Sequence, residues 1–188
     1  MKILICAGGT GGHIYPAVAL GEKMIEKNEQ NQLFYIGSNT RMEKEVIPSF
    51  GYSFIGMDID NFKRGIVGKI ISLYKMIRAY LMCLKVIKDK QIDVVIGFGN
   101  YISVPVVLAA KHMGVVTLIH EQNALPGKAN LFLGKQVDAV VGSYPVNLDY
   151  FPIKKTYIYG NPRAQLAYQY KVSESFYHHY ELNSSLKT

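Results

Sequence analysis

Seven short apolar runs alternate with helical stretches along this chain, and that alternation limits the fold more than any other feature. The runs cover residues 3–6, 33–36, 53–57, 94–96, 115–119, 139–141 and 156–159. Most are continuously apolar, as expected for strands buried on both faces of a parallel sheet. Helical spacing falls between them, over about 16–28, 40–49, 66–89, 102–113 and 127–135. The pattern predicts an α/β domain with a doubly wound parallel sheet and right-handed crossovers.

Length and composition fit one domain of this kind. The chain has 188 residues, of which 49% are hydrophobic and 19% are charged, which is typical of a globular protein with its own core. We expect the domain to cover residues 1–164 and the polar, aromatic stretch 165–188 to be a tail or interdomain linker. Cys6 and Cys83 stand far apart in apolar surroundings, as reduced core thiols of a cytosolic protein do. The sequence predicts no signal peptide and no membrane span.

A glycine-rich stretch, residues 7–16 with the sequence AGGTGGHIYP, separates the first predicted strand from the first predicted helix. Four glycines in five positions let backbone N–H groups approach an anion, and the following helix N-terminus adds positive potential. His13 stands at the mouth of this loop, and the ordinary pKa of histidine suits proton transfer near neutral pH. The stretch indicates a nucleotide-sugar or phosphate-handling site. The alternative is a tight turn in which the glycines serve only the backbone and His13 caps the helix.

Two other kinds of nucleotide loop do not fit this stretch. A Walker loop would continue into Gly-Lys-Ser or Gly-Lys-Thr, which is absent. The dinucleotide fingerprint would need glycine at Ile14 and an acidic residue after the second strand, where residues 37–39 read GSN. We therefore expect no NAD and no other cofactor. We also expect no metal, because the adjacent His178 and His179 lack a third ligand at suitable spacing and fit a surface helix better.

Two further loops follow predicted strands that end at the same edge of the sheet. The fourth strand runs into residues 97–103, GFGNYIS, for which a plain turn and a ligand-binding role are both open. The fifth strand ends in residues 120–123, HEQN, whose four hydrogen-bonding side chains suit a substrate rich in hydroxyl groups. His120 taken alone is also compatible with a structural role. Ligands of doubly wound sheets bind at the carboxyl ends of the strands, where these loops are expected.

The charge of the chain is concentrated in one segment. The formal net charge is +7, and residues 62–90 contain eight Lys or Arg against the single acid Asp89. The segment is predicted as a long helix, with one apolar stripe to dock on the sheet: Ile70, Leu73, Tyr74, Ile77, Leu81 and Leu84. A solvated basic face is the simpler interpretation. The surplus apolar residues among the lysines favour an anionic lipid surface, and nucleic acid is not expected because no recognition motif is present.

Taken together, these motifs resemble the N-terminal domain of the MurG family. The matching residues occur in order over about residues 1–165: 8–13 with Pro16, 41–43, 46–48, 97–99 with Tyr101, Ser103 and Pro105, 120–123, Gly127, Asn130 and 160–162. Members of this family are peripheral membrane enzymes with the GT-B architecture, two Rossmann-like domains that face each other across a cleft. The resemblance implies that this chain is the first, acceptor-side domain of such an enzyme, at the cytoplasmic face of the plasma membrane.

The resemblance also implies a reaction and residue roles. N-acetylglucosamine would pass from UDP-N-acetylglucosamine to lipid I with inversion, in one displacement that needs no metal and no cofactor. His13 would be the general base, Thr10, Gly11 and Gly12 would lie against the diphosphate, and Asn123 would contact the donor. Further substrate contacts are expected from Gly99, Asn100, Tyr101, Ser103, Glu121, Gln122 and Arg163. The residues expected to face the membrane are Lys69, Ile71, Lys75, Arg78 and Met82.

This sequence departs from the family pattern in several places. Asn100 and Val104 replace glycines that the family usually has in the second loop, and Ala164 stands where an arginine is usual, with Arg163 one position early. The chain also stops where a donor domain would begin, so we expect no transfer by this chain alone. The alternatives are a non-catalytic membrane-anchoring subunit of a split GT-B transferase and a general nucleotide-binding module. A reading frame that continues beyond Thr188 would favour the enzyme fragment, a stop codon would favour the split subunit, and tight UDP-sugar binding would favour the module.

Overall fold

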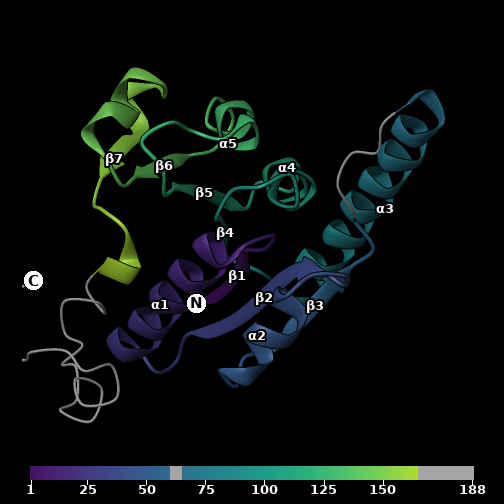
Figure 1. Cartoon of the computed structure of the whole chain (residues 1–188). Coiled ribbons are helices and arrows are strands. Elements are labelled where there is room, and N and C mark those ends of the chain that lie inside the picture. The colour runs from purple at the N-terminus through teal and green to yellow at the C-terminus, as the bar shows by residue number, and fades with distance from the viewer. Residues whose placement is uncertain (60–64, 165–188) are drawn as a thin grey trace, which may run out of the picture.

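A computed structural model describes residues 1–59 and 65–164, and in this part seven parallel strands form one sheet (Figure 1). The strands are β1 Lys2–Cys6, β2 Gln32–Ser38, β3 Phe54–Met57, β4 Val94–Gly97, β5 Val116–Glu121, β6 Ala139–Gly142 and β7 Thr156–Ile158. Their spatial order is β3-β2-β1-β4-β5-β6-β7. The direction of winding therefore reverses between β1 and β4, as in Rossmann-like domains. The predicted tail, including His178 and His179, lies outside the described residues.

Helices cover the two faces of the sheet and confirm the predicted α/β architecture. α1 (Gly11–Lys27) and α2 (Glu43–Ser49) pack on one face, whereas α3 (Ile66–Lys90), α4 (Ser103–His112) and α5 (Lys128–Leu133) lie on the other (Figure 1). β1 shows why the sequence produces two cores. Ile3 and Ile5 pack with α1, and the alternating Leu4 and Cys6 pack in the core shared with α3 and α4. Short 3₁₀ turns at Pro145–Asp149 and Ile153–Lys155 connect β6 to β7.

Helix α1 begins earlier than its sequence pattern predicts. The expected start was near residue 16, but Thr10 is the N-cap and Gly11 is already helical. Glycine is a poor helix former and proline lacks an N–H donor, so both residue types suggested a loop. Burial of Ile14, Ala17 and Val18 against β1 and β2 outweighs these preferences. His13 is therefore a residue of the first helical turn and not of a long flexible loop.

The predicted docking stripe of α3 is wrong except for Leu84, which packs against the core. Ile70, Ile77 and Leu81 are 62%, 51% and 57% exposed, and the buried residues of α3 are Ser72, Ala79, Cys83 and Ile87. Small side chains let α3 approach α4 closely, whereas the N-terminal half of α3 extends away from the sheet (Figure 1). Within the part of the chain that the structure describes, no helix combines the length and apolar character needed to cross a bilayer.

Candidate active site at the glycine loops

The two glycine loops lie side by side because β1 and β4 are neighbours in the sheet. Cys6 at the end of β1 is in register with Gly97 at the end of β4, so each loop leaves the same edge at the winding reversal. Gly99, with φ of +87°, brings the second loop against the first. A Cβ atom at Gly99 would lie 3.3 Å from Cδ2 of His13 and 3.2 Å from Nδ2 of Asn130. The absence of a side chain there allows the two loops and α5 to meet around the His13 ring.

His13 has the environment of a neutral base. Its Nδ1 lies 3.0 Å from Oγ1 of Thr10, and when Nδ1–H donates to that hydroxyl, the Nε2 lone pair remains free to accept a proton. Burial lowers the pKa of His13, against a smaller opposing effect of the Glu121 and Glu43 carboxylates. A lowered pKa keeps the imidazole unprotonated at neutral pH. The structure therefore places Thr10 beside His13 and makes the first helical turn suitable for proton transfer.

Glu43 holds the first glycine loop from beneath, a role that the sequence did not predict. The side chain is fully buried, and its carboxylate accepts hydrogen bonds from the Gly9 N–H at 3.1 Å and the Ser38 N–H at 3.0 Å. A Cβ atom at Gly8 would collide with this carboxylate. The Gly9 N–H therefore donates its hydrogen bond within the protein. The signal was an acidic residue at the start of the helix after β2, the strand that borders β1.

Side chains of the second loop mainly shape the loop itself. Ser103 is buried and donates from Oγ to the Gly99 carbonyl at 2.6 Å. Asn100 has a left-handed backbone, φ +65°, and its Oδ1 accepts from the Tyr101 N–H at 2.7 Å. The Arg41 guanidinium lies 5.9 Å from the centre of the Tyr101 ring. The predicted residues Gly99, Asn100, Tyr101 and Ser103 thus come together beside the first loop.

The loop after β5 is organised by Glu121. This buried carboxylate accepts from the N–H and Nδ2 of Asn123 through one oxygen, at 2.9 and 3.1 Å, and from Gly127 N–H and Asn130 Nδ2 through the other, at 3.1 and 2.9 Å. Four donors on one carboxylate close the loop into a fixed shape. Gln122 is also buried, whereas Asn123 is exposed at the surface of this loop. Of the HEQN residues, Asn123 is therefore the one exposed to solvent.

His120 connects β5 to the segment that follows β7. Its ring stacks on Phe98 with centroids 5.2 Å apart, Nε2 lies 3.0 Å from the Gly160 carbonyl, and Nδ1 lies 3.0 Å from Nε2 of Gln122. Because the Gln122 amide donates to Nδ1, Nε2–H donates to Gly160. Burial lowers the pKa of His120, which keeps this neutral form. Both ring nitrogens of His120 therefore take part in hydrogen bonds within the chain.

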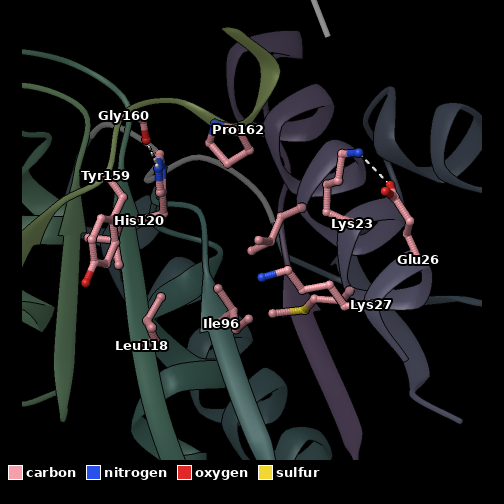
Figure 2. Close-up of a pocket in the computed structure, with 12 residues that line it drawn as sticks. Lys23, Glu26, Lys27, Ile96, Leu118, His120, Tyr159, Gly160 and Pro162 are labelled. Carbon is pink, nitrogen blue, oxygen red and sulfur yellow. Dashed lines mark hydrogen bonds and ion pairs between the residues drawn. The ribbon is translucent and has the colours of Figure 1, made fainter. Parts of the chain in front are cut away.

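A cavity of about 640 Å³ lies on the α1 face of the sheet, behind His120 (Figure 2). Leu20 and Met24 of α1 face Ile96, Leu118 and Val141 of the sheet across it, and Pro162 covers one end. Lys27 borders the cavity, and Lys23 forms an ion pair with Glu26 at its rim. Arg163 stacks over the Tyr15 ring at 4.6 Å, beside the first turns of α1. His13 does not line this cavity, and the cavity is therefore separate from the glycine loops.

Comparison with known proteins decides the family. Residues 3–141 match the glycosyltransferase family 28 N-terminal domain. The chain belongs to this family. Among curated relatives of this family 28 domain, the UDP-N-acetylglucosamine–N-acetylmuramyl-(pentapeptide) pyrophosphoryl-undecaprenol N-acetylglucosamine transferase of Lactococcus lactis subsp. cremoris MG1363 is 39% identical over 166 residues, 88% of this chain and 46% of that protein. The enzyme of the same name from Natranaerobius thermophilus is 38% identical over 190 residues, covering 100% of this chain and 52% of that protein.

Solved structures support the same placement. The crystal structure of Acinetobacter baumannii MurG superposes with a TM-score of 0.73 at 27% identity, covering 85% of this chain and 46% of that one. The Staphylococcus aureus MnaA–UDP co-structure superposes with a TM-score of 0.66 at 13% identity and shows a shared fold only. The family 28 domain described here therefore spans about half the length of the relatives and structures that it matches. The resemblance to the MurG family and the Rossmann-like fold are both confirmed.

Proposed function

We propose that this chain is the acceptor-side half of an inverting transferase that moves N-acetylglucosamine from UDP-N-acetylglucosamine to a lipid-linked muramyl-pentapeptide diphosphate. The observation that carries the proposal is the juxtaposition of His13 with Gly99, which leaves a neutral imidazole beside two glycine loops at the winding reversal of the sheet. We take the two substrates of the proposed reaction from the names of the curated relatives. The second half, which the relatives have beyond the matched region, would supply the donor side of the cleft.

The chemistry would be a single displacement at the anomeric carbon of the donor sugar. Nε2 of His13 accepts the proton of an acceptor hydroxyl as that oxygen attacks the anomeric carbon, and the bond to UDP breaks with inversion. The N–H groups of Gly11 and Gly12, in the first turn of α1, would face the acceptor diphosphate and add the potential of the helix N-terminus. Asn123 would contact the donor. The lowered pKa of His13 supports this role, because the base must be unprotonated when substrate binds.

The test is a transfer assay with UDP-N-acetylglucosamine and a short-chain lipid I analogue. The chain is assayed alone, joined to the second half of a relative, and mixed with that half as a separate polypeptide. We expect transfer only when both halves are present. Transfer by the joined halves supports an enzyme fragment, and transfer by the separate halves supports a split enzyme. Inactivity of both, with each half folded, would contradict the proposed reaction.

We also propose that the exposed face of α3 rests on an anionic membrane, at the cytoplasmic surface where the lipid-linked acceptor would be reached. Val67, Ile70, Tyr74, Ile77 and Leu81 repeat every three or four residues and are all more than half exposed. Ile71 and Met82 extend this face. Apolar groups bordered by cations are what an interfacial helix uses to bind anionic lipid.

The structure refines which cations to test. At 3.6 residues per turn, Arg78 and Lys85 border the apolar stripe and Lys88 falls within it, whereas Lys69 lies on the opposite side of α3. Lys75 forms an ion pair with Asp58 at 2.8 Å. The cations best placed for lipid contact are therefore Arg78, Lys85 and Lys88, all of them exposed.

Replacing Arg78, Lys85 and Lys88 with glutamine should weaken binding to phosphatidylserine-containing vesicles by about 100-fold, at roughly 1 kcal/mol for each cation near the surface. Co-sedimentation across a series of anionic lipid fractions measures the effect. The control replaces Lys44, Lys135 and Lys154, three exposed lysines outside α3, with the same loss of charge. Equal weakening by the two triple variants would contradict a specific role for α3.

A further inference from the structure

The two glycine loops are joined by one side chain, Asn100. Its Nδ2 donates to the Gly8 carbonyl at 3.3 Å, across 92 positions in sequence. The same Nδ2 lies where a Cβ atom of Gly9 would stand, so the Asn100 amide packs directly on the backbone of the first loop. Its Oδ1 holds the Tyr101 N–H at 2.7 Å within the second loop. Asn100 therefore spans both loops with the two ends of a single amide group.

The conformation of Asn100 explains how one short side chain can do this. Its φ of +65° is left-handed, a region that asparagine occupies more readily than other residues with a side chain. That backbone turns the side chain back toward Gly8. The preceding residue, Gly99, lies so near His13 that a Cβ atom on it would stand 3.3 Å from the ring. A change in the position of Asn100 would therefore move Gly99 relative to His13.

We propose that Asn100 is a positioning residue that latches the second glycine loop onto the first and holds Gly99 against the His13 ring. The effect of this Asn100 latch on catalysis rests on the proposed function, but the contact between the two loops does not. The glycine loops are held from two sides, by Glu43 from α2 and by Asn100 from the second loop. With both contacts made, the glycine loops keep one shape around the His13 ring before any substrate arrives.

Two substitutions test the two hydrogen bonds of the Asn100 side chain separately. Asn100→Gly keeps the left-handed backbone without strain and removes both hydrogen bonds. Asn100→Asp keeps an acceptor for the Tyr101 N–H but replaces the donor to Gly8 with an oxygen. Asn28→Asp is the matched control, because Asn28 also accepts a local backbone hydrogen bond, at the far end of α1.

The test is amide hydrogen exchange of this chain, followed by NMR at Gly9 and Tyr101. In Asn100→Gly, both amides should exchange about 3- to 10-fold faster, the effect of one lost hydrogen bond. In Asn100→Asp, Gly9 should exchange faster while Tyr101 stays protected. Gly9 is informative because its own N–H bonds to Glu43, which neither substitution touches. Unchanged exchange at Gly9 in both variants would overturn the latch.

The pKa of His13 provides a second test of the Asn100 latch. Burial lowers the pKa of His13, while Glu43 and Glu121 raise it. Loosening the loops in Asn100→Gly should hydrate the ring and move the pKa of His13 upward, toward its ordinary value, as measured by NMR titration. A pKa of His13 that is the same in Asn100→Gly and wild type would overturn its positioning role. The transfer assay decides the proposed function separately, since neither NMR measurement depends on the reaction.

Discussion

Replacing His13 with alanine is expected to lower the rate of transfer by the joined halves about 10²- to 10⁴-fold, the usual contribution of a general base. The reason is that no other group of the glycine loops combines a neutral lone pair with the position beside Gly99. Initial rates at saturating donor and acceptor measure the effect. His112→Ala is the control, because His112 is exposed on the far side of the sheet, where it meets the Tyr80 ring. A His13→Ala variant that keeps more than about a tenth of the wild-type rate would exclude this role.

The same residue sets the expected dependence on pH. Burial lowers the pKa of His13, so the unprotonated base is present at neutral pH and is lost as the pH falls. The transfer rate should therefore be level above about pH 7 and decline in acid with a midpoint below about 6.5, the ordinary value for histidine. A profile of kcat/KM from about pH 5 to 8 measures this limb. The limb should disappear from the residual activity of His13→Ala.

Replacing Glu121 with alanine should lower the free energy of unfolding by about 3–5 kcal/mol. The carboxylate is buried and receives four hydrogen bonds, so its removal leaves the N–H groups of Asn123 and Gly127 without their acceptor and takes one of two acceptors from the Asn130 amide. That loss is a large part of the roughly 5–15 kcal/mol that stabilises a typical domain. Urea unfolding followed by circular dichroism measures it.

Two comparisons make the Glu121 result specific. Glu121→Gln keeps one acceptor oxygen but turns an amide N–H₂ toward donors, so we expect a smaller loss, about 2 kcal/mol. Glu45→Ala removes an exposed carboxylate on α2 and should change stability by less than about 0.5 kcal/mol. If Glu121→Ala were as stable as Glu45→Ala, the hydrogen bonds of Glu121 would not hold the loop.

The fold was predictable because its signals are local and repeated. Each strand of a parallel sheet is buried on both faces and therefore appears as an apolar run, and the runs at 3–6 and 94–96 lie within β1 and β4. The glycine loops were found for the same reason, since strand, glycines and helix occur consecutively. The extra residues His120 and Glu121 in β5 were harder to assign, because polar side chains at a strand end resemble a loop.

What the sequence could not predict depends on contacts between distant segments. Glu43 lies 34 positions from Gly9, and although an acidic residue at the start of the helix after β2 can be recognised in the sequence, its hydrogen-bond partner cannot. The buried side of α3 was mistaken because large apolar residues suggested the core, whereas Ala79 and Cys83 allow closer helix packing. The contact of Asn100 with the first loop depends on the left-handed backbone of Asn100, which the sequence does not reveal. In each case, the information missing from the sequence is which residues lie close together in the fold.

The central place of β1 has a consequence for how the chain is made. β1 pairs with β2 on one side and with β4 on the other, joining Ile3 to both Leu33 and Val94. Residues 39–93 separate the end of β2 from the start of β4, so at about 5–20 residues per second the second edge of β1 stays open for roughly 3–11 s during translation. An open strand edge pairs readily with other chains. Pausing of the ribosome between codons 60 and 90 would prolong that exposure and raise the yield of aggregate over folded protein.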